Sequence, residues 1–326
     1  MVKAKKNFLK IIGILILFVS IIIVLKYNEQ KSSMNDDGYD VTMEIILTDG
    51  MQSQNINVFS AKDLQISTLA GLCINDDRIL ICDKGNNCIK EYDLNLAYVE
   101  SYGKLGLGEL EFSNPVDIVQ YENKYYVLDA GNNRVQVLDN DMTYVRKIDL
   151  PELPDFQGGA RYISMEIDSQ GVLYLTTNSM IEEANKVYIL IKDEFAKTEQ
   201  SVIGPLINCN GNIYVADMLE YHDYGDSKVA ASGYNSLYII QDGKLKKEIE
   251  LPIKYAAIDG YYENENIYLL SASQAICTGF SLKENVYDPV FKLPKIGLDA
   301  YVAVIPEKKI YVSDCENNKL YQIDLQ

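Results

Sequence analysis

The sequence contains a single histidine, His222, and no tryptophan among its 326 residues. One histidine excludes every mechanism that needs two or more, including histidine-rich zinc centres. The chain also lacks a C-x-x-C pair and a D-x-D-x-D-G loop, which argues against zinc-ribbon and thioredoxin-like motifs and against EF-hand calcium sites. We therefore expect no bound metal and no cofactor.

Basic residues are scarce, since 30 Lys and Arg face 47 Asp and Glu and leave a net charge of −17. Five of the lysines lie within the first 26 residues, which contain no acid, so the remainder carries 25 − 47 = −22. A body this acidic repels phosphate backbones, which excludes nucleic acid as the main partner. The apolar fraction of 48% is that of an ordinary globular protein.

Residues 11–25 (IIGILILFVSIIIVL) form a charge-free apolar run between Lys10 and Lys26. The lysines before the run predict residues 1–27 as a basic cytoplasmic tip and one transmembrane helix, with the rest of the chain outside the cytoplasm. The alternative is a cleaved secretory signal, although no small-x-small cleavage site follows the run. Both interpretations place the body outside the cytoplasm. Residues 28–40 are polar and predict a linker to a domain spanning 41–326.

The body of the chain repeats one pattern six times. Each repeat has a β-branched or aromatic run that ends in a short polar residue. These runs are RILICD (78–83), KYYVLD (124–129), VLYLTT (172–177), NIYVAD (212–217), NIYLLS (266–271) and KIYVSD (309–314). Their ends are spaced by 40 to 54 residues, with a mean near 46. This period predicts one four-stranded β-propeller blade per repeat, and so an all-β, six-bladed β-propeller.

The chain resembles the NHL-repeat family of β-propellers. The best match is residues 102–139, with YGKLGLGELEFSNPVDIV followed by YYVLDAGNNRVQVLD, while CDKGNNCIKEYD and YVSDCENNKLYQID are further matches. The resemblance covers residues 61–326 and implies the propeller fold. It implies little about chemistry, because propellers of this kind include both binding proteins and enzymes.

The sixth repeat reaches only its third strand at Gln326. A blade with three strands would leave an exposed edge, so a strand from elsewhere must complete it. The spare β-like segments are residues 41–47 and 55–59, and we expect one of them to lie beside residues 319–325.

Asp83, Asp129, Asp217 and Asp314 stand at strand ends, where they could suggest a ring of metal-binding carboxylates. Turn residues follow the clearest of them, as in DKGNN and DAGNN. We therefore predict that these carboxylates accept backbone N–H bonds and fix the turns. We also expect Gly85 and Gly131 to adopt positive φ there.

Six cysteines outside the cytoplasm could form disulfides, and Cys82 with Cys88 is the one pair close in sequence. Cys73 and Cys209 fall within predicted inner strands, as small buried residues do. We expect free thiols.

The candidate ligand site is the propeller face above blades 3 and 4, where the connecting loops are longest. Blade 4 carries an insertion, LEYHDYGDSKVAASG (219–233), and the entry to blade 3 contains PDFQGGAR (154–161). Tyrosines and acids at loop tips suit ligand contact, and adjacent glycines allow close backbone approach. The predicted contacts are Tyr221, His222, Asp223, Tyr224 and Arg161.

The sequence shows no catalytic motif, so we expect a binding or scaffolding module for a protein, a peptide or a cell-surface glycan. The alternative is a metal-dependent hydrolase or lyase that uses carboxylates of the central channel. Glu166, Asn208 and Asp259 lie near predicted inner strands and are its candidate ligands. Convergence of three such side chains on one point would favour the alternative.

Overall fold

The computed structural model describes residues 55–75, 77–153, 160–179, 182–218, 220–223, 228–231, 236–251, 255–283 and 287–325. The chain divides into two units, residues 1–49 and 50–326, and every described residue belongs to the second. The predicted anchor and linker lie outside these ranges. Within them, no helix is both long and apolar enough to cross a membrane.

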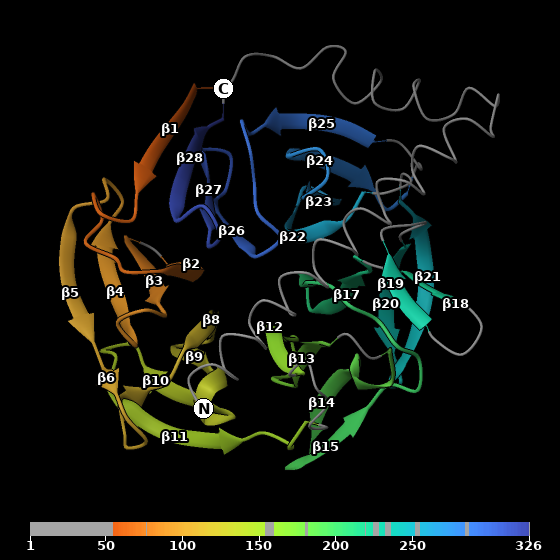
Figure 1. Cartoon of the computed structure of the whole chain (residues 1–326), viewed down its shortest axis with the longest axis horizontal. Helices are drawn as coiled ribbons and strands as arrows, with labels where there is room; N and C mark the ends of the chain where they lie inside the picture. Colours follow the sequence, from red (N-terminus) through yellow and green to blue (C-terminus); the bar gives the residue numbers. More distant parts are fainter. Residues whose placement is uncertain are drawn as a thin grey trace, which may run out of the picture. The chain divides into compact units, whose positions relative to one another are not determined.

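Six four-stranded antiparallel sheets surround a central axis, which confirms the predicted six-bladed β-propeller (Figure 1). Blade 1 comprises β2 (Leu69–Asn75), β3 (Arg78–Asp83), β4 (Cys88–Asp93) and β5 (Tyr98–Tyr102). Blade 2 comprises β8 (Pro115–Tyr121), β9 (Lys124–Asp129), β10 (Arg134–Asp139) and β11 (Tyr144–Asp149). Blade 3 comprises β12 (Arg161–Ile167), β13 (Leu173–Asn178), β14 (Val187–Ile191) and β15 (Glu194–Lys197). Blade 4 comprises β16 (Leu206–Cys209), β17 (Asn212–Ala216), β20 (Ser236–Gln241) and β21 (Lys244–Glu250). Blade 5 comprises β22 (Ala257–Glu263), β23 (Asn266–Ser271), β24 (Ile276–Ser281) and β25 (Tyr287–Lys292).

Blade 6 joins both ends of the described chain. Its order is β26 (Ala300–Ile305), β27 (Lys309–Asp314), β28 (Lys319–Asp324) and β1 (Asn55–Ser60). β1 pairs antiparallel with β28 along its whole length, from Asn55 opposite Asp324 to Ser60 opposite Lys319. The expectation that an N-terminal strand closes the ring is confirmed, and the segment is the later of the two candidates.

Burial follows the position of a strand within its blade. In blade 1, β3 is buried over RILICD from its second residue onward, whereas the outer strand β5 is almost entirely exposed. The inner strands are covered on both faces by neighbouring blades, so they need continuous apolar side chains. Hydrophobic clusters fill the spaces between blades, as where Leu128 and Val137 of blade 2 pack with Met165 of blade 3.

Three of the four strand-end aspartates, Asp83, Asp129 and Asp314, fix turns as predicted. The Asp83 carboxylate accepts backbone N–H bonds from Ser67, Thr68 and Asn86. Asp129 and Asp314 are buried in equivalent places, where Asp129 accepts from the N–H of Ser113 and Asp314 from that of Asn317.

The glycines of these turns play a different role from the one predicted. Gly85 and Gly131 do not adopt positive φ, whereas Asn87 and Asn133 do, with φ of 58° and 51°. Glycine is needed because of close packing. A Cβ at residue 131 would lie 2.5 Å from the carbonyl oxygen of Ser113.

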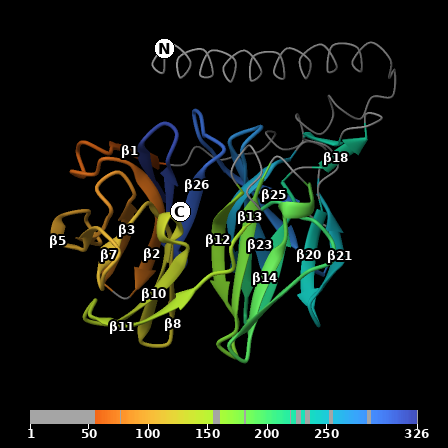
Figure 2. The ribbon, with the colours of Figure 1, turned by 60° about the horizontal axis from the view of Figure 1, so that its bottom comes forward.

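Two short ribbons accompany the blades. β6 (Lys104–Leu105) pairs with β7 (Glu111–Phe112) between blades 1 and 2. β18 (Glu220–Asp223) and β19 (Lys228–Ala231) form a hairpin inserted between β17 and β20 of blade 4. Figure 2 shows β18 beyond the end of blade 4, on one face of the ring. A 3₁₀ helix, η2 (Glu182–Ala184), lies in the equivalent connection of blade 3.

Candidate functional site

A cavity of about 110 Å³ lies on the inner strands around the propeller axis. This volume accommodates several water molecules or one compact chemical group. Blades 1 to 6 all contribute to its lining. Its apolar lining includes Leu72, Ile118, Ile163, Met165, Pro205, Met218 and Ile258. Its acidic lining consists of Asp117, Glu166, Asp259 and Asp299.

The mouth of the cavity lies where inner strands begin and second strands end. Arg161 is the first residue of β12 and pairs with Asn178, the last residue of β13. Leu298 precedes β26, and its side chain is 62% exposed. Met218 follows β17 and leads into the β18–β19 insertion. The cavity therefore opens on the face from which the long loops of blades 3 and 4 leave.

Three polar side chains of the lining connect one blade to the next. Asp117 Oδ2 accepts a hydrogen bond from the backbone N–H of Met165 (2.9 Å), which links blade 2 to blade 3. Asp259 accepts in the same way from Val302 and links blade 5 to blade 6. Ser164 Oγ accepts from the N–H of Leu206 (3.1 Å) and links blade 3 to blade 4. These groups have a structural role at the axis in addition to any role in binding.

Glu166 differs from Asp117 and Asp259. Within the described residues, its carboxyl accepts one hydrogen bond, from the N–H of the next residue, Ile167 (3.3 Å). Burial raises the pKa of Glu166 to about 8, and the nearby charge of Asp117 adds to the effect. Glu166 is therefore a largely neutral carboxyl at pH 7 that can both donate and accept a hydrogen bond.

Burial is also the main cause of the raised pKa values of Asp117 and Asp259. It raises the pKa of Asp117 to about 7, against the opposing effect of the N–H groups of Met165 and Ile118. It raises the pKa of Asp259 well above its usual range, although Val302 donates to this carboxyl. Asp299 instead makes an ion pair with Lys84 (2.9 Å). The cavity is thus rich in carboxyls, and burial raises the pKa values of two of them, Asp117 and Glu166, to near neutral pH.

Tyr301 of blade 6 spans the channel. Its hydroxyl donates a hydrogen bond to the carbonyl oxygen of Ile163 in blade 3 (3.2 Å). Blades 3 and 6 lie opposite each other in the ring (Figure 1). This contact braces the two halves of the propeller beside the cavity.

Replacing Tyr301 by phenylalanine keeps the ring in place and removes the contact across the channel. We expect the free energy of unfolding in urea to fall by about 1 kcal/mol, the usual net contribution of one such hydrogen bond. An unchanged urea midpoint would contradict the bracing role.

The structure brings one predicted contact residue directly to the cavity. Arg161 lies at the mouth. Tyr221, His222 and Asp223 lie on β18, opposite residues of β19. Tyr224 lies outside the described residues. Because β18 begins two residues after Met218, the insertion starts at the rim of the same cavity.

The proposed metal ligands do not form one group. Glu166 and Asp259 line the cavity, but Asn208 is not among its lining residues. Its amide instead donates to the carbonyl of Ile167 (2.6 Å) and accepts from the N–H of Gly211 (2.8 Å). Across the described ranges, no three His, Cys, Asp or Glu side chains are placed to hold a metal ion. Since Asp117 and Asp259 are already bonded to neighbouring blades, the present donor set does not fit a metal.

The six cysteines are free thiols. Cys73 belongs to the inner strand β2, and burial raises its thiol pKa to about 12, with Glu166 and Asp117 contributing. Burial also raises the pKa of Cys82. These thiols are poor nucleophiles.

Asp117, Asp299 and Tyr301 were not predicted from the sequence. For Asp117 the available signal was an acid within an otherwise apolar inner strand, PVDIVQY of β8. A buried strand tolerates an acid only where it is bonded or functional, so this position was a candidate on physical grounds.

The fold is shared with several solved structures. They include virginiamycin B lyase from Staphylococcus aureus (9% identity, TM-score 0.53, covering 84% of this chain and 100% of that one). The calcium-binding protein regucalcin from Agrobacterium tumefaciens is 11% identical (TM-score 0.57, 80% and 92% covered). The aldose sugar dehydrogenase from Streptomyces coelicolor, solved in its PQQ-bound form, is 10% identical (TM-score 0.53, 83% and 98% covered). No family model and no curated protein matches the sequence. The structural likenesses confirm the β-propeller fold.

Proposed function

We propose that the protein is a ligand-binding module, anchored to the membrane by residues 11–25 and displayed outside the cytoplasm. Its ligand is a protein, a peptide or a surface glycan that binds the face where the cavity opens. One observation carries the proposal. The axial cavity opens beside Arg161 and beside the start of the blade 4 insertion, which are the places that the sequence assigned to ligand contact.

The chemistry of the cavity favours an uncharged polar group as the part of the ligand that enters. Neutral Glu166 offers both a donor and an acceptor, and burial raises the pKa of Asp259 in the same cavity. Hydroxyl and amide groups match such carboxyls, and both glycans and peptides supply them. The neighbouring apolar residues Met218 and Ile258 would contact the carbon skeleton.

The test is a screen of the full chain, in detergent, against an array of neutral oligosaccharides and hexapeptides. For the strongest hit, Arg161→Ala and the double variant Tyr221→Ala with Tyr224→Ala should each weaken binding at least tenfold without lowering the melting temperature. Arg146→Ala is the matched control, because Arg146 is an exposed arginine on the outer strand β11. Equal affinity in all variants would reject this face as the binding site.

The metal-dependent hydrolase or lyase remains the alternative, and it would use the same cavity. Calorimetric titration of the full chain with Ca²⁺ or Mg²⁺ distinguishes the two functions. Saturable binding of Ca²⁺ or Mg²⁺ that Glu166→Gln abolishes would favour the hydrolase or lyase. Such binding would require Asp117 and Asp259, which are bonded to neighbouring blades, to rearrange.

A further inference from the structure

Exposed apolar side chains gather on one sector of the outer rim, away from the cavity. Eight large hydrophobic residues are exposed in the described part of the chain, and six belong to blades 6, 1 and 2 or to the connection between blades 1 and 2. Four lie within ten residues of one another. They are Tyr98 (45% exposed), Val99 (53%), Leu105 (67%) and Leu107 (77%). We call these four residues the blade 1 rim. Exposed groups of this kind mark interaction sites on soluble domains.

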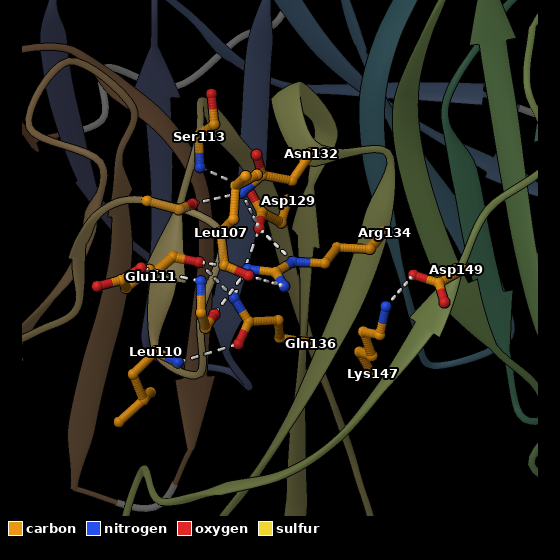
Figure 3. Close-up of polar contacts among 12 residues, drawn as sticks. Leu107, Leu110, Glu111, Ser113, Asp129, Asn132, Arg134, Gln136, Lys147 and Asp149 are labelled. Atoms are coloured by element: carbon orange, nitrogen blue, oxygen red, sulfur yellow. Dashed lines mark hydrogen bonds and ion pairs between the residues drawn. The ribbon is translucent and has the colours of Figure 1, made fainter.

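The loop that carries Leu107 is held by buried side chains of blade 2. Arg134 donates to the carbonyl oxygens of Leu107 (2.7 Å), Gly108 (2.9 Å) and Glu111 (2.6 Å). Gln136 donates to Glu111 (2.7 Å) and accepts from the N–H of Leu110 (3.1 Å). Figure 3 shows both side chains directed at this loop.

A glycine-containing loop held in this way presents its exposed leucine in one conformation. A partner that contacts it has little loop entropy to remove, so the loop is preorganised for binding.

Among the described residues, the neighbouring strand β5 pairs on one side only, with β4, and its open edge carries no lysine, arginine or proline. Four of the six outer strands carry a lysine, an arginine or a proline, which discourage the addition of further strands. These strands are β11 (YVRKID), β15 (EFAK), β21 (KLKKEIE) and β25 (YDPVFK). β5 (YVESY) and β1 (NINVFS) carry none. Of these two, β5 is the one that continues into exposed leucines.

Side-chain contacts hold β5 against the rest of blade 1. The Tyr98 ring packs edge-on against Tyr92, with centroids 6.1 Å apart, and the Lys90 amine lies 5.6 Å from its centre. The Tyr102 hydroxyl donates to Glu91 (2.7 Å). The free edge is therefore flanked by an ordered aromatic ring.

We propose that the blade 1 rim is a docking site for an extended segment of a partner protein, which adds to the edge of β5 as a fifth strand. Backbone groups of β5 would pair with the segment, while its apolar side chains contact Val99, Leu105 and Leu107. The charge of this protein surface determines which other residues the partner segment needs. Glu100 and Glu109 are exposed on this surface, the exposed Lys104 is paired with Glu111 (3.4 Å), and the body carries a charge of −22, so the segment bears lysine or arginine between its apolar residues.

The probe for the test is a synthetic peptide, KVTVKVTVK, with an acidic counterpart, EVTVEVTVE. Binding to the full chain in detergent is followed by fluorescence anisotropy at 0.15 M salt, and backbone protection is followed by hydrogen exchange. We expect the basic peptide to bind, to slow amide exchange in β5, and to bind at least tenfold more weakly to Val99→Lys. The acidic peptide should bind far more weakly.

Val145→Lys is the matched control, because it adds the same charge to an exposed valine on the protected edge of β11. It should leave the affinity within twofold of the parent protein. Equal binding to the parent and to Val99→Lys would show general charge attraction and overturn the proposal, as would no binding at all. Concentration-dependent dimerisation that Val99→Lys abolishes would make a second copy the occupant and overturn the partner segment.

Discussion

Replacing Arg134 by methionine is expected to lower the free energy of unfolding by about 3–5 kcal/mol. The Arg134 guanidinium forms an ion pair with Asp129 (2.8 Å), and both side chains are buried. Methionine preserves much of the apolar volume but leaves the buried Asp129 carboxylate with fewer partners. It also removes donors from the carbonyl oxygens of Leu107, Gly108 and Glu111.

Urea denaturation of the full chain in detergent measures this loss. Arg146→Met is the control, since Arg146 is exposed and its replacement should change stability by less than about 0.5 kcal/mol. A loss below about 1 kcal/mol in Arg134→Met would mean that water replaces the guanidinium. The loop that carries Leu107 would then not be rigidly held. The blade 1 rim would in that case not be preorganised for binding.

Stability is expected to fall by several kcal/mol as the pH rises from about 4.5 to about 8. The folded state raises the pKa of Asp117 from 3.8 to about 7 and that of Glu166 from 4.5 to about 8. Between the unfolded and folded pKa values, the folded state binds more protons than the unfolded state. The free energy of unfolding therefore decreases with rising pH across this window and levels off above it. Shifts of about 3 to 3.5 pKa units correspond to about 4–5 kcal/mol, an upper limit for a half-buried group such as Glu166.

Glu166→Gln isolates one of these contributions. Glutamine cannot ionise, so the variant should be more stable than the parent at pH 9 and equally stable at pH 4.5. Glu122 lies at an exposed position of the β8–β9 turn. The free energy of unfolding of Glu122→Gln should therefore follow that of the parent at every pH. A pH profile of Glu166→Gln that follows the parent throughout would show that Glu166 is ionised and hydrated in the folded protein.

The fold could be predicted because repetition is visible in a single sequence. The period near 46 residues fixed the blade, and DAGNN with Asp129 identified a turn that one carboxylate holds together. The incomplete sixth repeat required a closing strand, because an open edge is unfavourable. Each of these inferences depends on local chemistry or on counting, which the sequence contains directly.

The cavity could not be predicted in the same way, because β-bulges decide which side chains face the axis. The register of β8 shifts between Pro115 and Asp117, and that of β22 shifts between Ala257 and Asp259. One extra residue moves every following side chain to the other face of a strand. Alternation in the sequence therefore does not reveal that Asp117 and Asp259 meet neighbouring blades, nor that Glu166 is left with so few partners.

The closing strand has a consequence for the order in which the chain can acquire its structure. Blades 1 to 5 are each built from one contiguous stretch of chain, with the β18–β19 hairpin inserted in blade 4, and can form as soon as their own residues are available, because their contacts are local. β1 precedes them all, yet its partner β28 lies more than 250 residues later. During synthesis, β1 must wait unpaired until the residues of β28 have emerged. Pairing of β1 with β28 is therefore the last step of folding. This step converts an open row of blades into a closed ring.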